Sequence, residues 1–277
     1  MFSPWYASAI EGGHRPEARA HVALNVALYD RGATRAWIFA EHDGRTSALT
    51  SRSMAIGAST VEHEGDDVVV RVDETTSPFP RPGARRLRGQ IRVRGVEPST
   101  LGPIALDARN KHLWWPIAPR AVVDVHFPEL GISFSGDGYH DANAGDEPLG
   151  AAFRSWTWGR WHLGRRTAIA YDTVLCDGTT RERTLSVGDT AVHDISRDVS
   201  RTPLGRGAWG VPLRSACDGG GGARLVRRLE DSPFYARGIA ETELFGQRAT
   251  GIVESLDLQR FAAPWVRLLL PFRSRRA

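Results

Sequence analysis

The clearest pattern in this sequence is an alternation of apolar and polar residues from Arg86 to Arg94. Leu87, Ile91 and Val93 occupy every second position together with a glycine, and Arg or Gln residues lie between them. Side chains in a strand alternate between its two faces, so this pattern predicts a β-strand with one buried face. The same alternation recurs at 68–72, 123–127 and 256–259.

Turn-forming residues separate the predicted strands, and no segment has the period of an amphipathic helix. Clear turn signals are Glu64-Gly65-Asp66, Asp137-Gly138 and Cys176-Asp177-Gly178. Barrels and barrel-like sheets protect the edges of antiparallel strands and leave an interior for an apolar ligand. We therefore predict an all-β fold of two lipocalin-like antiparallel β-barrel or sandwich units. We expect the first at 1–135 and the second at 136–277, with the functional site near their junction.

The composition is that of an ordinary globular chain of one or two domains, because 41% of the 277 residues are hydrophobic and 25% are charged. The net charge is +4, but Lys111 is the only lysine and the arginines are spread along the chain. A nucleic-acid partner is therefore not predicted. Cys176 and Cys217 belong to no CxxC pair, so neither a zinc site nor a redox motif is predicted, and reduced cytoplasmic thiols are the default.

The apolar segment Trp265–Leu270 contains or precedes Arg267, Arg273, Arg275 and Arg276. A basic and apolar segment of this kind can attach a protein to an anionic membrane surface. It can equally be a last strand with a basic, solvated end. The sequence contains no N-terminal signal region and no apolar run of spanning length, so a soluble or membrane-peripheral chain is expected.

Residues capable of chemistry gather in two places, at 110–115 and at 134–158. The motifs GxSxG and HExxH and paired cysteines are all missing from the sequence. His112, His140 and Asp141 could in principle bind a metal, but their spacing fits no common ligand pattern. We therefore predict acid or base chemistry that uses neither a metal nor an organic cofactor.

Four residues are the predicted catalytic groups. Asp141 is either a turn residue or a carboxylic acid that apolar surroundings keep protonated and ready to deliver a proton. Tyr139 would share the face of Asp141 in an extended backbone, where it orients the acid or fills the core. His112 is either a structural histidine or a base. Trp114 would lie on the same face as His112, and its ring could stabilise a developing positive charge.

Three tryptophans, Trp115, Trp156 and Trp158, are the predicted substrate-binding residues. The first adjoins Trp114, and the other two lie close together in the second cluster. For Trp156 and Trp158 two interpretations stay open, because they are either core aromatics or one wall of an apolar channel.

Several longer strings of residues point to one enzyme family. The longest and most specific runs from Gly138 to Leu149. The others are Phe2–Tyr6, Ala23–Tyr29, Pro116–Pro119, Ser232–Arg237 and Glu254–Leu258, and the likeness continues to Pro271-Phe272-Arg273. Together these strings closely resemble the acyclic carotenoid 1,2-hydratases, also called hydroxyneurosporene synthases.

The resemblance implies an activity and a set of roles. Members of the family add water to the terminal carbon–carbon double bond of acyclic carotenoids such as neurosporene and lycopene, without an organic cofactor. The family's His-x-Trp and Tyr-x-Asp pairs are matched by His112 with Trp114 and by Tyr139 with Asp141. The resemblance therefore implies a hydro-lyase in which Asp141 protonates the second carbon and leaves a tertiary cation at the first. Trp114 and Tyr139 would stabilise the cation, and His112 would position or deprotonate the attacking water.

The implied partners are an acyclic carotenoid and a membrane surface, because the substrate resides in the bilayer. We expect a cytoplasmic chain, peripheral to the cytoplasmic membrane. Two alternatives stay open: a related lipocalin-like isomerase or cyclase, and a non-catalytic carrier of an apolar ligand. The sequence sets neither the preferred carotenoid, nor single or double hydration, nor the oligomeric state.

The sequence departs from the family pattern in two ways. Family members carry an opening segment rich in Gly, Tyr and Trp before the Phe-Ser-Pro string, whereas this sequence begins at Met1-Phe2. We therefore expect a truncated chain whose first unit lacks an edge strand. The second departure is Val253, where the family has a histidine before Glu254, and we expect this change to affect packing more than chemistry.

Overall fold

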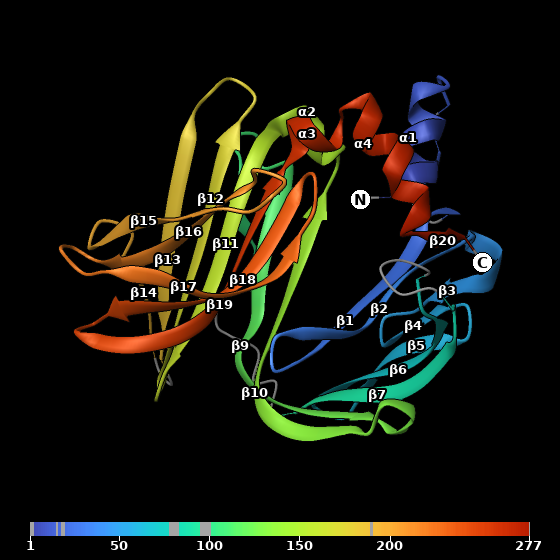
Figure 1. Cartoon of the computed structure of the whole chain (residues 1–277), viewed down its shortest axis with the longest axis horizontal. Coiled ribbons are helices and arrows are strands. Elements are labelled where there is room, and N and C mark those ends of the chain that lie inside the picture. Colours follow the sequence, from blue (N-terminus) through green and yellow to red (C-terminus); the bar gives the residue numbers. More distant parts are fainter. Residues whose placement is uncertain are drawn as a thin grey trace. The chain divides into compact units, whose positions relative to one another are not determined.

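The structure is a computed structural model, and it consists mainly of antiparallel strands (Figure 1). The residues that it describes are 3–14, 16–17, 20–77, 83–94, 101–188 and 191–276. The described residues form two compact units, each built from several segments of the chain. Unit 1 takes 1–98, 120–140 and 267–277, and unit 2 takes 99–119 and 141–266. The all-β prediction is confirmed, although in the described part of the chain the sheets stay open instead of closing into barrels.

Both units are discontinuous in sequence because two long strands contribute to each. These strands are β9 (His112–Phe127) and β10 (Ile132–Gly145). The sequence predicted two domains with a boundary between residues 135 and 136. The two units describe which segments pack together and do not test that boundary, so it stays a prediction.

Unit 1 contains a three-stranded sheet, in the order β1-β2-β20, and most of an eight-stranded sheet. The larger sheet runs β10-β9-β7-β6-β5-β4-β3, and β8 (Ile104–Ala105), which belongs to unit 2, also pairs with β9. Other elements of unit 1 are α1 (Pro4–Glu11), β1 (Val22–Asp30), β2 (Ala33–His42), η2 (Gly44–Thr46), β3 (Ser47–Leu49), β4 (Ser53–Ile56), β5 (Ser59–Glu64), β6 (Asp67–Thr75), β7 (Arg86–Arg94), η3 (Pro128–Leu130), η4 (Leu270–Phe272) and β20 (Arg275–Arg276).

The strand predicted from the alternation at 86–94 coincides with β7. Leu87 is completely buried, in a core that also contains Ile38 and Phe127. Gly89 is required at this place, because a Cβ atom there would lie 2.2 Å from Cδ1 of Phe127. The alternation therefore identified both the strand and its buried face.

Unit 2 is built on a seven-stranded sheet in the order β14-β13-β12-β11-β19-β18-β17, with a separate hairpin of β15 and β16 (Figure 1). The hairpin packs on one face of the sheet, where Trp161, Leu213 and Val253 are buried together. The elements are α2 (Leu149–Ala152), β11 (Phe153–Leu163), β12 (Arg166–Leu175), β13 (Thr180–Val187), β14 (Val192–Asp194), β15 (Val199–Arg206), β16 (Pro212–Asp218), β17 (Ala223–Asp231), β18 (Tyr235–Leu244), β19 (Gln247–Asp257) and α3 (Leu258–Phe261).

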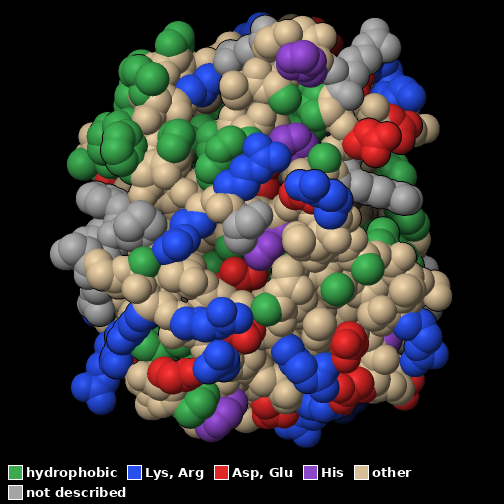
Figure 2. Space-filling view, turned by 90° about the vertical axis from the view of Figure 1, so that its right-hand side faces the viewer, with side chains coloured by type: hydrophobic (Ala, Val, Ile, Leu, Met, Phe, Trp, Pro, Cys, Tyr) green, Lys and Arg blue, Asp and Glu red, His purple; other side chains and the backbone are tan. Residues whose placement is uncertain are grey.

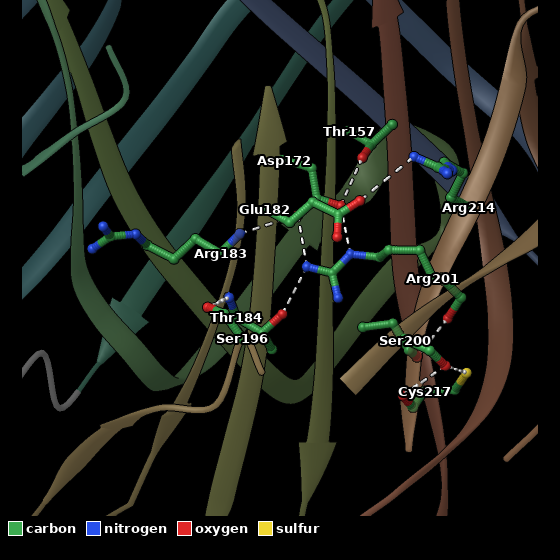
Figure 3. Close-up of polar contacts among 12 residues, drawn as sticks. Thr157, Asp172, Glu182, Arg183, Thr184, Ser196, Ser200, Arg201, Arg214 and Cys217 are labelled. Atoms are coloured by element: carbon green, nitrogen blue, oxygen red, sulfur yellow. Dashed lines mark hydrogen bonds and ion pairs between the residues drawn. The ribbon is translucent and has the colours of Figure 1, made fainter. Parts of the chain in front are cut away.

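A buried ion pair joins the hairpin to the sheet (Figure 3). Arg201 of β15 donates from Nε and Nη2 to the two carboxylate oxygens of Asp172 in β12, at 2.6 and 2.7 Å. The same guanidinium donates to Thr184 of β13 at 2.9 Å. Burial opposes the charge of Arg201, but its hydrogen bonds and its attraction to Asp172 outweigh burial and raise its pKa. The hairpin is thus held by directional contacts as well as by apolar packing.

Charged side chains of both signs are mixed on the surface. On the face shown in Figure 2, Lys and Arg side chains are interspersed with Asp and Glu side chains. Several arginines form cross-strand ion pairs, such as Arg71 with Glu62 at 2.6 Å and Arg92 with Asp67 at 2.8 Å. Part of the basic composition therefore serves pairing within the sheets.

Two predicted turns are confirmed, and one is wrong. Gly65 and Gly178 lie at positive φ in hairpin turns. Asp137-Gly138, in contrast, lies inside the continuous strand β10. A Cβ on Gly138 would be 3.3 Å from Cβ of Val123, so this glycine permits a close approach between β9 and β10.

The possible last strand over Trp265–Leu270 is wrong, because this segment forms α4 (Pro264–Leu269) and begins η4. Val266 and Leu270 are buried and four positions apart, a helical spacing that the continuous apolar run conceals. Helix α1 was also missed, although Ser3 caps it by accepting a hydrogen bond from the backbone NH of Tyr6. Within the described residues, no helix is both long enough and apolar enough to cross a bilayer.

Candidate active site

One face of the seven-stranded sheet of unit 2 carries a row of large side chains. Trp158 of β11 is paired with Tyr171 of β12 on one side and with Glu254 of β19 on the other. Residues directly opposite one another in antiparallel strands share a face, so these three lie in one row, which Arg237 of β18 continues. The Trp156 ring lies edge-on to Tyr171, with 5.9 Å between centroids. We call this surface the aromatic face; the hairpin of β15 and β16 packs on the opposite one.

Trp114 and Asp141 meet against the aromatic face. Trp114 is completely buried, and its ring lies edge-on to that of Tyr171 at a centroid distance of 5.3 Å. Its indole Nε1–H donates a hydrogen bond of 2.8 Å to Oδ2 of Asp141. Two residues from separate strands are thus brought together beside the ring of Tyr171. Asp141 itself is half-buried.

Two carboxylates affect the pKa of the Tyr171 phenol. Burial raises its pKa, and the negative charges of Asp141 and Glu254 raise it further. The phenol therefore stays protonated throughout the physiological pH range. Both carboxylates are therefore near enough to the Tyr171 hydroxyl for their charges to act on it.

Glu254 is held in a polar network within the sheet. Arg237 donates from Nε to Oε1 of Glu254 at 2.8 Å and from Nη1 to Oε1 of Glu230 at 3.1 Å. Burial together with the charge of Glu254 raises the pKa of Tyr235 well above its usual value. The carboxylate of Glu254 is oriented by Arg237.

His112 lies at the start of β9, two residues before Trp114, and is buried. Its backbone NH donates to Oδ2 of Asp107 at 2.7 Å, and its ring lies edge-on to Phe153 at 4.8 Å. Burial opposes the charge of Asp107, but the backbone NH groups that it accepts outweigh burial and lower its pKa. The Nε2 atom of His112 is 3.6 Å from Oε1 of Glu147. The histidine is therefore packed at the base of the strand that presents Trp114.

The other predicted site residues occupy different positions. Tyr139 lies two residues before Asp141 in β10, is half-buried, and belongs to unit 1. Trp115 follows Trp114, so its side chain points to the opposite face of β9. It is partly exposed, and its Nε1 donates to the carbonyl of Leu101 at 2.6 Å. The structure brings together Trp114, Asp141 and Trp156, with Trp158 in the same face of the sheet, but it does not place Trp115 with them.

Tyr171 and Glu254 were missed as site residues by sequence reasoning. Tyr171 lies in the mainly apolar strand β12, and this local sequence indicates a buried strand without marking any residue as part of a site. Glu254 and Tyr235 fall within strings that resemble the family, and this was the one available signal for them. Val253, the departure from the family pattern, is fully buried in the core on the opposite face of the sheet.

Comparisons of the sequence with known proteins agree with one another. The family model described as "Carotenoid hydratase CrtC" matches residues 1–277. An acyclic carotenoid 1,2-hydratase of Thiocapsa roseopersicina is 38% identical over 276 residues, which cover 99% of this chain and 66% of that protein. The enzyme of the same name from Cereibacter sphaeroides is 34% identical over 273 residues, or 98% of this chain and 92% of the relative. The chain thus spans about two thirds of one relative and nearly all of the other.

Solved structures support the fold alone. A Nitrosomonas europaea protein proposed to be AttH superposes with a TM-score of 0.52 at 12% identity, covering 77% of this chain and 72% of that one. CghA, solved with Sch210972, gives a TM-score of 0.52 at 10% identity, covering 86% and 79%. The predicted lipocalin-like fold class is confirmed.

The resemblance stated from the sequence is confirmed by these matches, and so is the expectation of a family of hydro-lyases. A family model that matches the whole chain, together with relatives 34% and 38% identical over nearly all of it, shows that this chain belongs to the carotenoid hydratase CrtC family.

Proposed function

We propose that this chain is a hydro-lyase that adds water to the terminal carbon–carbon double bond of an acyclic carotenoid such as neurosporene or lycopene. The hydrogen bond between the Trp114 indole and Asp141 carries the proposal, because it holds a carboxyl group beside the rings of Trp114 and Tyr171. An alkene is a weak base without a polar handle. Its protonation therefore requires an acid that is held in place among apolar groups.

In the proposed reaction Asp141 is the acid. The Trp114 N–H donates to Oδ2, so we assign the transferable proton to Oδ1. The π electrons of the double bond take this proton at the second carbon and leave a tertiary cation at the first. The rings of Trp114 and Tyr171 stabilise the cation, a role that the family resemblance also implies for Tyr139, and water attacks the cation to give a tertiary alcohol. The reaction as proposed uses side chains and water, with no organic cofactor or metal.

Trp156 and Trp158 provide one wall for the polyene in this proposal. Both lie on the aromatic face, and the Trp156 ring lies edge-on to that of Tyr171. Trp115 stays a predicted substrate-binding residue, although it lies on the other face of its strand. A proton acceptor for the attacking water is also needed, and His112 is the acceptor predicted from the sequence.

The test is to incubate the purified chain with lycopene or neurosporene in liposomes prepared in isotopically labelled water. Mass spectrometry should detect addition of one water that carries the solvent oxygen. An isomerase or cyclase would give a product of unchanged mass, and a carrier would return the carotenoid unaltered. Either of these results would replace the hydratase proposal.

We also propose that the chain is cytoplasmic and works at a membrane surface. The support is the segment 267–276 of unit 1, in which Leu268 is 73% and Phe272 is 67% exposed. Arg273, Arg275 and Arg276 follow Phe272 within the same segment. Exposed apolar side chains beside cationic ones suit an anionic bilayer surface, where the apolar substrate is dissolved.

A further inference from the structure

We propose that Glu254 accepts the proton of the attacking water, so that two carboxyl groups divide the reaction between them. This inference rests on the proposed hydration and deepens it. Asp141 would protonate the alkene, and Glu254 would hold the water and take its proton. The role of proton acceptor thereby passes from His112 to a residue of the aromatic face.

The position of Glu254 in the sheet is the first argument. Glu254 and Tyr171 are the two cross-strand partners of Trp158, on opposite sides of it. Neighbouring strands lie about 4.8 Å apart, so the backbones of these two residues are separated by about 10 Å across Trp158. The ring of Tyr171 also contacts that of Trp114, the partner of Asp141. The two carboxyl groups therefore lie on either side of a set of aromatic rings.

The contacts of Glu254 are the second argument. Its side chain is 18% exposed, and Arg237 donates to Oε1 at 2.8 Å. This guanidinium orients the carboxylate and balances its charge, as a group that must bind water in one place requires.

The chemistry needs only a modest base. When water bonds to the tertiary cation, the first product is a protonated alcohol, which is a strong acid. An ordinary carboxylate takes its O–H proton, and the electrons of that bond stay on oxygen as the neutral tertiary alcohol forms. Asp141 is then a carboxylate and Glu254 a carboxylic acid. Asp141 then takes up one proton from solvent and Glu254 releases one, which resets the site, so the net reaction is alkene plus water to alcohol.

His112 is better placed to support β9 and β10 than to hold water. Its ring is buried and packs against Phe153, and its Nε2 atom has no hydrogen-bond partner among the described residues. Nε2 is 3.6 Å from Oε1 of Glu147, and Nδ1 would be 2.8 Å from a Cβ on Gly145. We therefore assign His112 a positioning role for the strands that carry Trp114 and Asp141.

The experiment separates protonation from capture of the cation by water. Wild type, Asp141→Asn, Glu254→Gln and His112→Gln are each incubated with lycopene liposomes in deuterium oxide. Hydrated product and deuterium in recovered lycopene are both measured. Reversible protonation by Asp141 places deuterium on the second carbon when the cation returns a proton instead of binding water.

We expect Glu254→Gln to lower hydration by about 100-fold or more, in the range of general-base effects, while deuterium exchange continues or rises. Asp141→Asn should lose both signals. The matched control is Glu241→Gln, since Glu241 of β18 also pairs with an arginine, Arg224 at 3.0 Å. This control should keep both signals at wild-type level.

Three outcomes would overturn the assignment. Wild-type hydration in Glu254→Gln would show that the carboxylate is not needed. A parallel loss of hydration and exchange in that variant would indicate a structural role. If His112→Gln loses hydration but keeps deuterium exchange, and Glu254→Gln does not behave in this way, the role of proton acceptor returns to His112. Failure of the wild type to hydrate or exchange would instead refute the proposed function, a result that is distinguishable from all three.

Discussion

At the scale of single residues, the acid proposed for this site depends on one neighbouring indole. A carboxyl group in a strand can rotate about its side-chain bonds, and the Trp114 N–H restricts it by bonding to Oδ2 of Asp141 at 2.8 Å. Trp114 is itself completely buried and is packed edge-on against Tyr171. The orientation of the acid is thus set by an aromatic residue that we also propose to stabilise the cation.

Replacing Asp141 with Asn tests the acid directly. The amide oxygen can still accept the Trp114 hydrogen bond, but the side chain has no acidic proton. We expect hydration of lycopene to fall by about 100- to 10,000-fold, the usual effect of removing a general acid. Product formation is measured by mass spectrometry, and thermal unfolding and lycopene binding serve as controls that should not change. Retained turnover in this variant would refute the assignment of Asp141.

Replacing Trp114 with Phe tests the orienting hydrogen bond. Phenylalanine keeps an aromatic ring but lacks the N–H donor, so the carboxyl group loses its restraint. A hydrogen bond to an ionisable group contributes about 1.5–3 kcal/mol. We therefore expect Trp114→Phe to lower the rate of lycopene hydration by about 10- to 100-fold. The matched control is Trp209→Phe, because Trp209 is 43% exposed and stacks on Trp265 away from Asp141. Equal activities of the two variants would contradict the role of the indole.

At the scale of strands and helices, local pattern and tertiary pairing contribute differently. The strand β7 and the turns at Gly65 and Gly178 could be predicted because alternation and turn residues are local signals. Asp137-Gly138 has the same local signal as a turn, yet β9 pairs alongside it and the strand continues. Pairing with a distant strand therefore outweighed turn propensity there.

The residues of the candidate site also fall into two groups: those that a local sequence pattern indicates and those that only strand pairing brings in. His112 and Trp114 stand out because unusual residues lie close together in the sequence, as does Asp141 in the second cluster. Tyr171 and Glu254 come from different strands, and they join the site only through the register of β12 and β19 with β11. Register is decided by burial and by turns across the whole sheet, so an isolated strand sequence does not reveal it.

Gly145 at the end of β10 provides a test of how these strands position His112. A Cβ at this glycine would lie 2.8 Å from Nδ1 of His112. We expect Gly145→Ala to lower the free energy of unfolding by about 1–3 kcal/mol, as overpacking does, and to lower hydration activity as well. Gly136→Ala in the same strand is the matched control, because its Cβ would meet no atom within 4 Å. Urea unfolding and the hydration assay should distinguish the two, and indistinguishable variants would contradict close packing at His112.

The ion pair of Asp172 and Arg201 tests the attachment of the β15–β16 hairpin. Both side chains are nearly buried, at 8% and 5% exposed, and removal of one partner leaves an uncompensated charge. We expect Asp172→Leu or Arg201→Met to lower the free energy of unfolding by about 3–5 kcal/mol each. The double variant should lose less than the sum, because its two changes remove both charges. Additive losses in urea unfolding would show that the pair is not coupled.

At the scale of the whole molecule, an enzyme for a bilayer-dissolved substrate requires a surface that meets lipid. On the face shown in Figure 2 charges of both signs are mixed, and several arginines are paired with carboxylates within the sheets. The segment 267–276 differs, since it combines Leu268, Leu269 and Phe272 as exposed apolar side chains with nearby arginines. Exposure of several large apolar groups in one short segment is unusual unless they meet a partner.

This segment leads to a prediction for binding to vesicles. The chain should cosediment with vesicles of phosphatidylcholine and phosphatidylglycerol more than with vesicles of phosphatidylcholine alone, and high salt should weaken the difference. The double change Leu268→Ser and Phe272→Ser should lower binding by about 10-fold or more, because it removes apolar contacts of about 1.5–3 kcal/mol each. Leu49→Ser is the matched control, since Leu49 is 63% exposed in β3. If the control loses as much binding as the double variant, or if neither loses any, the membrane contact does not lie in this segment. Hydration of lycopene dispersed in detergent should be unaffected by the double change, because it leaves the aromatic face intact and alters only access to the bilayer.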